Sequence, residues 1–213
     1  MVISIALLGF GASGTLLAIY RRWMLVRIDF LLPFLMISSG LLMTVVIRAS
    51  RYEFLLFDSY TLFVDRSQFS RLLATYFLFF LPFFFGALAI GLIFVKRVSH
   101  IGTYYFSDLL GSGLGGILAL FLFWQFSPQE IPSVIAILPI FAGVLIIRKR
   151  ARPYLISYTI LSLSLVIVHL IKPFDLLPSQ FKSISYALNL PEAKIDQEIS
   201  SPYGLVQVVS SPV

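Results

Sequence analysis

The chain has 213 residues, of which 59% are hydrophobic and 12% are charged, and its formal net charge is +6. Soluble domains carry about 25% charged residues, and a water-soluble fold of this composition is excluded because it would expose too much apolar surface. The absence of cysteine excludes disulfides, thiol catalysis and cysteine metal sites, and the basic residues follow no nucleic-acid-binding pattern, so nucleic acid is not an expected partner.

Six long apolar runs take up most of the chain. They cover residues 2–20, 30–47, 72–95, 109–126, 131–147 and 154–171. Each has roughly 17–24 residues, close to the 20 or so that a helix needs to cross the hydrocarbon core of a bilayer. The sequence therefore predicts an all-α membrane protein, with a bundle of about six transmembrane helices over residues 1–171 and the lipid bilayer as its partner.

The first run contains a glycine pattern like that of dinucleotide-binding proteins. Gly9, Gly11 and Gly14 match G-x-G-x-x-G, and Asp29 follows at about the spacing of a ribose-binding acid. That interpretation requires alternating strands and helices further on, but every later run is long enough to span a membrane. We therefore interpret the three glycines as a helix-packing face, because small residues let helix backbones approach closely in lipid.

The fourth run begins with a second glycine pattern, formed by Gly111, Gly113, Gly115 and Gly116. Gly111 and Gly115 lie about one helical turn apart, which again predicts close helix packing; a backbone path for a ligand is the alternative. The second and fifth runs each contain Leu-Pro followed by a glycine several residues later. These similarities would fit an inverted repeat of three spans and three spans, the plan of many transporters.

The basic residues are unevenly divided between the two sides of the predicted bundle. The loops at 21–29, 96–108 and 148–153 carry nine lysines and arginines, whereas the loops on the other side carry four. Basic residues mark the cytoplasmic side of short loops. We therefore expect these three loops in the cytoplasm, and the N-terminus and the tail outside a bacterial-type inner or plasma membrane.

Three ionisable side chains lie at the ends of apolar runs: Asp108, Glu130 and His169. Ionisable residues inside a membrane are functional candidates, but at these positions water or lipid headgroups can solvate them, and we interpret them as membrane-edge polar residues. His100 and His169 are too far apart in sequence to suggest a metal site. The residues present predict no catalytic, cofactor-binding or metal site.

The composition changes in the tail, residues 172–213, which contains five prolines and scattered charges. Residues 180–189 are expected to form a short amphipathic helix. Residues 203–209 are rich in β-formers and predict a strand. Because a lone strand cannot satisfy its backbone groups, the tail is interpreted as the start of a soluble domain, and the chain as truncated before the rest of it.

Several stretches together carry a resemblance to a known family. They are residues 3–13 (Ile-Ser-Ile-Ala-Leu-Leu-Gly-Phe-Gly-Ala-Ser), 81–91 (Leu-Pro-Phe-Phe-Phe-Gly-Ala-Leu-Ala-Ile-Gly), 104–116 (Tyr-Tyr-Phe-Ser-Asp-Leu-Leu-Gly-Ser-Gly-Leu-Gly-Gly), 181–182 (Phe-Lys), 190–195 (Leu-Pro-Glu-Ala-Lys-Ile) and 200–208 (Ser-Ser-Pro-Tyr-Gly-Leu-Val-Gln-Val). The chain thereby resembles the membrane region of multi-spanning spermidine synthase-like proteins, in which several helices precede an aminopropyltransferase-like domain.

This resemblance implies a membrane module of a polyamine-synthesising type of protein, without catalytic residues of its own. A donor of the S-adenosylmethionine type is implied only for the missing domain, together with the acidic residues that would hold and deprotonate the attacking amine. Family members commonly begin with a further helix that precedes the first residue here. The implied partner is a separate or missing catalytic domain, or other membrane subunits, so whether the protein is an enzyme is left open.

Two alternatives remain beside this interpretation. The chain could be transporter-like, if the three-plus-three repeat is real, or a structural subunit of a larger membrane complex that docks through its glycine faces. The side of the tail is also open at this point. Charge counting places it outside, whereas a domain that uses a cytosolic nucleotide cofactor would be expected inside.

Overall fold

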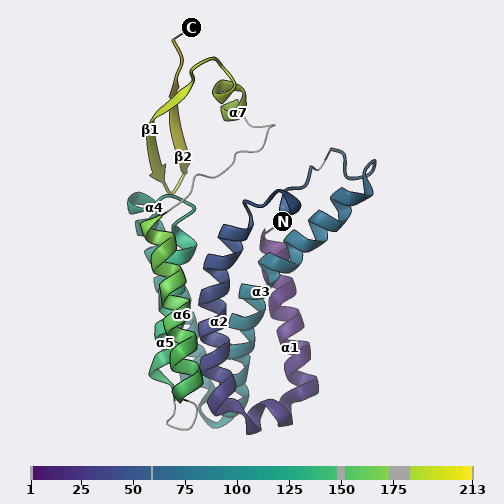
Figure 1. The fold of residues 1–213 in the computed structure, drawn as a ribbon. Helices are drawn as coiled ribbons and strands as arrows, with labels where there is room; N and C mark the ends of the chain where they lie inside the picture. The colour runs from purple at the N-terminus through teal and green to yellow at the C-terminus, as the bar shows by residue number, and fades with distance from the viewer. Residues whose placement is uncertain (1, 59, 148–151, 173–182, 213) are drawn as a thin grey trace. The chain divides into compact units, whose positions relative to one another are not determined.

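The computed structural model describes residues 2–58, 60–147, 152–172 and 183–212 (Figure 1). The chain forms two compact units. The first consists of Met1–Asp108 and Pro132–Lys172, and the second of Leu109–Ile131 and Pro173–Val213. The fourth predicted span, residues 109–126, therefore belongs to the same unit as the tail. The predicted boundary between residues 171 and 172 is not the only division of the chain.

The described part of the chain contains long helices followed by a short helix and a β-hairpin. In chain order the elements are α1 (Val2–Val26), α2 (Ile28–Ala49), η1 (Glu53–Leu55), α3 (Arg66–Lys96), η2 (Val98–His100), α4 (Ile101–Gln125), α5 (Ile131–Leu145), α6 (Arg152–Ile171), α7 (Ser183–Leu188), β1 (Lys194–Ser201) and β2 (Gly204–Ser210). Each of the six predicted apolar runs coincides with one of the helices α1 to α6.

Five of the described helices are long and apolar enough to cross a membrane: α1, α2, α3, α4 and α6. Helix α5 is shorter, and its 15 residues rise only about 22 Å at 1.5 Å per residue. The prediction of an all-α membrane protein with a small β-region at its C-terminal end is confirmed.

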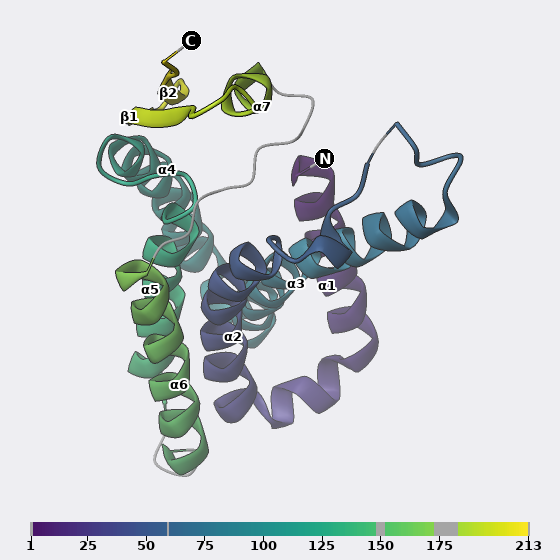
Figure 2. The ribbon, with the colours of Figure 1, turned by 45° about the horizontal axis from the view of Figure 1, so that its top comes forward.

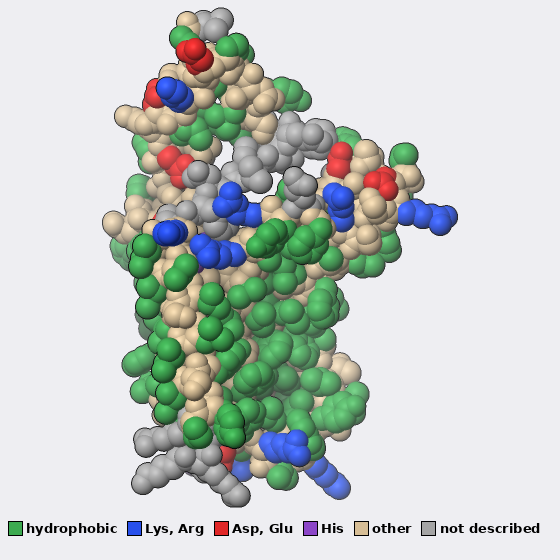
Figure 3. All heavy atoms as spheres, in the orientation of Figure 1, with side chains coloured by type: hydrophobic (Ala, Val, Ile, Leu, Met, Phe, Trp, Pro, Cys, Tyr) green, Lys and Arg blue, Asp and Glu red, His purple; other side chains and the backbone are tan. Residues whose placement is uncertain are grey.

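The surface of the first unit shows why lipid is its solvent. Large apolar side chains point outward along the helices, among them Leu7 (67% exposed) and Phe77 (64% exposed). Figure 3 shows such side chains over the middle of α1, α2 and α3, with lysines and arginines gathered near both ends. Soluble monomers rarely expose apolar patches of this extent, whereas hydrocarbon solvates them without cost.

Within the first unit, α3 packs against both α1 and α2, and α2 also packs against α6, as the two views in Figures 1 and 2 show. Leu17 of α1, Leu35 of α2 and Leu92 of α3 belong to one buried apolar cluster. Ile37 of α2 and Val166 of α6 belong to a second cluster, which also includes two residues of α5. Helix α2 therefore connects the two clusters of this unit.

Helix α3 begins with an aspartate as its N-terminal cap. Asp65 precedes the helix, and its carboxylate accepts hydrogen bonds from the backbone N–H of Ser67 (2.9 Å) and from the Ser67 hydroxyl (2.6 Å). These bonds, together with one from Gln68, lower the pKa of Asp65 because they favour its charged form. The cap thus satisfies backbone donors at the start of the helix, outside the apolar stretch.

Helices α2 and α5 approach each other most closely at two glycines. A Cβ added to Gly40 would lie 2.5 Å from the carbonyl oxygen of Ala136 and 2.8 Å from Cγ1 of Ile140. A Cβ added to Gly143 would lie 2.7 Å from Cγ1 of Ile37. The residue numbers rise along one helix as they fall along the other, so the helices are antiparallel, and each contributes one glycine to the contact.

The second unit contains the hairpin. Strands β1 and β2 are antiparallel, with Glu198 opposite Gln207 and Ile199 opposite Val206. The turn ends at Gly204, whose φ of +149° favours glycine because a Cβ would be strained there. The expected strand at 203–209 is found as β2, one residue further on. Strand β1 is not predicted from the sequence, because its centre is polar.

We predict that replacing Gly40 with alanine destabilises the bundle by about 1–3 kcal/mol, the usual cost of forcing extra atoms into a packed contact. The neighbour is a backbone carbonyl of α5, which cannot move aside as a flexible side chain can. The measurement is thermal unfolding of the purified protein in mild detergent.

Gly11→Ala is the matched control for this change, because nothing lies within 4 Å of the Cβ position at Gly11. Alanine there should leave stability unchanged or raise it, since alanine is the better helix former. Equal effects of the two substitutions would contradict the close α2–α5 contact.

Candidate functional site

The structure gives the seven glycines of the predicted packing faces different surroundings. A Cβ at Gly9 would lie 2.9 Å from Cβ of Phe83 on α3, so this glycine lets α1 and α3 approach closely. At the other six no atom lies within 4 Å of that position: Gly11, Gly14, Gly111, Gly113, Gly115 and Gly116. Their role in docking another helix stays a prediction.

The three membrane-edge polar residues also differ from one another. Asp108, in α4, and Glu130, just before α5, are half-buried. His169, in the last turn of α6, is 0% exposed, so water does not reach its side chain. The structure thus separates His169 from the other two by its burial, which its position in the sequence does not reveal.

Glu130 closes the turn between α4 and α5. Its carboxylate accepts a hydrogen bond from the backbone N–H of Ser127 (3.0 Å), and its own N–H donates to the carbonyl oxygen of Ser127 (2.9 Å). The bond to the carboxylate is the glutamate half of a capping box, and the bond to the carbonyl oxygen is a backbone turn contact. A structural role at the start of α5 therefore accounts for the Glu130 carboxylate.

The same turn is tied to the hairpin within the second unit. The hydroxyl of Ser127 donates to Oε1 of Glu198 (3.1 Å), and the side-chain amide of Gln207 donates to Oε2 of Glu198 (2.7 Å). Glu198 and Gln207 are opposite each other in the β-ladder. One carboxylate therefore connects β1, β2 and the α4–α5 turn. The sequence does not predict the bond to the turn, because Ser127 and Glu198 are 71 residues apart.

The hairpin has one face that exposes apolar side chains. Ile199 and Val206 are paired across the strands, and Val208 lies two residues further along β2 on the same side. Their exposed fractions are 57%, 58% and 48%. A two-stranded hairpin is at best marginally stable alone in water, so this face suits contact with another surface.

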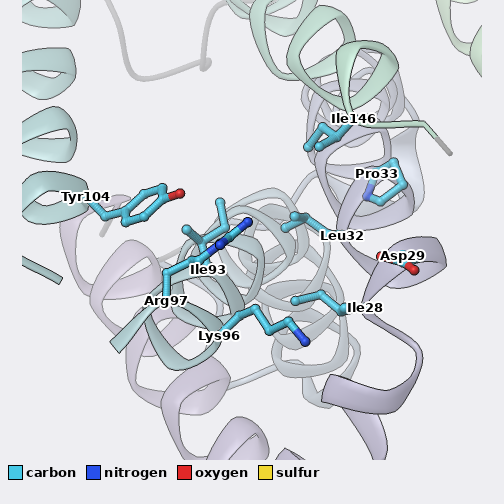
Figure 4. Close-up of a pocket in the computed structure, with 9 residues that line it drawn as sticks. All are labelled: Ile28, Asp29, Leu32, Pro33, Ile93, Lys96, Arg97, Tyr104 and Ile146. Atoms are coloured by element: carbon cyan, nitrogen blue, oxygen red, sulfur yellow. The ribbon is translucent and has the colours of Figure 1, made fainter. Parts of the chain in front are cut away.

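A pocket of about 230 Å³ lies in the first unit, at the end where α2 starts and α3 stops (Figure 4). It combines apolar walls with charged and hydroxyl groups. The lining residues are Ile28, Asp29, Leu32, Pro33, Ile93, Lys96, Arg97, Tyr104 and Ile146. Several of them belong to the loops at 21–29 and 96–108, which are predicted to be cytoplasmic. These segments are separated in the sequence, and no pattern there predicts that they meet.

Polar groups also lie inside the helical unit. The hydroxyls of Ser38 and Tyr158 are 2.9 Å apart, and the Ser39 hydroxyl donates to the carbonyl oxygen of Pro82 (3.0 Å). These bonds join α2 to α6 and to α3. Among the described residues, no group of three or more histidine, aspartate or glutamate side chains is placed to hold a metal ion.

No family model, curated protein or solved structure matches the chain. The resemblance to spermidine synthase-like proteins therefore stays a prediction from the sequence stretches quoted above.

We predict that Glu198→Ala loosens the hairpin. The change removes both hydrogen bonds to the carboxylate, and the loss of about 1 kcal/mol in an exposed site should speed amide exchange in β1 and β2 about fivefold. Hydrogen–deuterium exchange with mass spectrometry measures this directly. Glu192→Ala removes the same charge from an exposed position before β1 and should leave exchange unchanged; equal acceleration by both would argue against the Glu198 contacts.

Proposed function

We propose that the chain is the membrane module of a spermidine synthase-like protein. In this role the helices anchor the protein in a bacterial-type inner or plasma membrane, and the hairpin holds an aminopropyltransferase-like domain at the membrane surface. The module contributes no catalytic residue, and the donor of the S-adenosylmethionine type belongs to the domain that it holds.

The observation that carries this proposal is the exposed apolar face of the hairpin. Ile199, Val206 and Val208 are about half exposed, although β-branched side chains stabilise a sheet chiefly by packing on neighbours. A soluble domain that covers this face would bury these side chains and add partners to the strand edges. The lipid-solvated helices, by contrast, need no soluble partner to bury their outward-facing side chains.

The resemblance supports the same assignment from another direction. In spermidine synthase-like proteins the helical region precedes the N-terminal β-region of the enzyme, and the stretch Ser-Pro-Tyr-Gly at residues 201–204 resembles the start of that region. The tight turn of the hairpin is formed at this stretch, between Ser201 and Gly204. Tyr203 is 98% exposed at the turn, which fits a structural or docking role there.

We predict that the purified chain alone transfers no aminopropyl or methyl group from a sulfonium donor to an amine. The complex isolated from the source membranes in mild detergent should show aminopropyl transfer. Both preparations are assayed with labelled donor, and product is measured by chromatography. Turnover by the chain alone, or a complex without transfer activity, would contradict the proposed function.

The hairpin face supplies the matched variants for this assay. The double substitution Ile199→Asp and Val206→Asp should remove the transfer activity from the isolated complex, because two charges would be placed in the docking face. Glu192→Ala changes an exposed side chain before β1 and should retain the activity.

The orientation of the module can be tested because the chain contains no cysteine. Ser99 and Thr61 are both exposed and lie in different loops. We predict that Ser99→Cys reacts with a membrane-impermeant maleimide only after permeabilisation, whereas Thr61→Cys reacts in intact cells, because the basic loops mark the cytoplasmic side. The reverse pattern at these two positions would contradict the predicted orientation of the loops. Ser211→Cys reports the side of the hairpin: labelling in intact cells would agree with the charge count, and labelling only after permeabilisation would agree with a domain that uses a cytosolic donor.

A further inference from the structure

We infer that the pocket at the end of α2 and α3 binds the phosphate group of a phosphatidylglycerol headgroup. Arg97, Lys96 and the hydroxyl of Tyr104 would act as the donors. This inference is independent of the proposed function, because it concerns the first unit and its lipid surroundings and not the hairpin.

The three donors come from one continuous stretch of the chain. Lys96 ends α3, Arg97 follows as its C-terminal cap, and Tyr104 lies in the first turn of α4. In Figure 4 the guanidinium of Arg97 and the hydroxyl of Tyr104 both point into the space between α3 and α2. The Lys96 amine lines the same pocket nearer Ile28. Two cations and a hydroxyl around one cavity can bind a phosphate group, to which arginine can donate two parallel hydrogen bonds.

The cations are available for such a ligand. Lys96 and Arg97 are exposed, and within the described ranges no ion pair or side-chain hydrogen bond involves either of them. The end of α3 places a partial negative charge of about half an elementary charge near them. Two full positive charges exceed this, so the site remains attractive to an anion.

The remaining walls of the pocket favour a lipid over a free phosphate ion. Ile28, Leu32, Pro33, Ile93 and Ile146 form an apolar surface beside the charged groups. A cavity of about 230 Å³ is smaller than the roughly 300–1,000 Å³ of sites for drug-sized ligands. A cavity of this size suits a lipid headgroup alone. The acyl chains would lie outside it, against the exposed side chains of the helices.

The charge of the pocket distinguishes between headgroups. Asp29 also lines it, on the side away from Tyr104 (Figure 4). Lys96 and Arg97 supply the positive charge that attracts the single negative charge of a phosphodiester. The glycerol of phosphatidylglycerol adds no further charge. Basic pockets between helices on the cytoplasmic side are typical sites for anionic headgroups.

The test uses the full chain purified in mild detergent and titrated with phosphatidylglycerol, phosphatidylethanolamine or inorganic phosphate. Bound lipid is counted by native mass spectrometry, and the shift in thermal unfolding is measured in parallel for all three. We expect phosphatidylglycerol to bind tightest. Tighter phosphatidylethanolamine binding would overturn the inference in favour of a zwitterionic headgroup, and an equal thermal shift with inorganic phosphate would overturn it in favour of a free anion.

The variants test the two cations together and the tyrosine hydroxyl separately. Lys96→Gln with Arg97→Gln should weaken phosphatidylglycerol binding about tenfold or more, and Tyr104→Phe should weaken it about threefold. Unchanged affinity in the double variant would overturn the inference.

A matched control removes two cations outside the pocket. Arg21→Gln with Arg22→Gln changes the net charge by the same amount, at exposed positions in α1 on the same predicted side of the membrane. Its affinity for phosphatidylglycerol should stay within about twofold of the unchanged protein. An equal loss in the control would show that general surface charge, and not the pocket, attracts the lipid.

Discussion

The close approach of helix backbones is the constraint on which the helical unit depends. In lipid the apolar side chains gain nothing by leaving the solvent, so helices associate through van der Waals contact and interhelical hydrogen bonds. The contacts at Gly40 and Gly143 hold α2 against α5, and Gly9 holds α1 against α3. The Ser39–Pro82 hydrogen bond lies between α2 and α3. Without these small residues the outward-facing side chains would still be solvated, but the helices would lose their defined positions.

The helical part of the fold can be predicted from the sequence because hydrophobic length is a local property. A run such as residues 72–95 cannot remain in water and cannot cross lipid except as a helix or a closed barrel, so the run itself predicts α3. The packing of the helices cannot be predicted in the same way. Gly9 and Gly11 belong to the same motif, yet only Gly9 meets a neighbouring helix in the described structure. Which side of a helix faces a partner depends on rotations that one sequence does not determine.

The candidate sites could be predicted only in part, for the same reason. The basic loops are evident in the sequence, but the pocket requires residues 28–33 of α2, 93–97 of α3 and Tyr104 to meet, which follows from packing. Glu198 accepts hydrogen bonds from Gln207 in the neighbouring strand and from Ser127 in the α4–α5 turn. No sequence pattern predicts a contact between residues 127 and 198. Strand β1 was missed because its polar centre, which includes Glu198, hides the alternation that marks a strand.

The helices of the first unit and the hairpin of the second unit suit different solvents, lipid and water, and this difference accounts for the kind of partner that each surface suits. The first unit exposes its apolar side chains to lipid and has its lysines and arginines near the ends of its helices. It can therefore bind lipid headgroups by electrostatic attraction. The hairpin differs from these helices. Its Gln207 amide donates to the Glu198 carboxylate, whereas Ile199, Val206 and Val208 remain exposed. Water penalises that exposure at about 25 cal/mol for each Å². The surface that gains most from a protein partner is therefore the hairpin face, whereas the pocket of the helical unit gains most from a lipid.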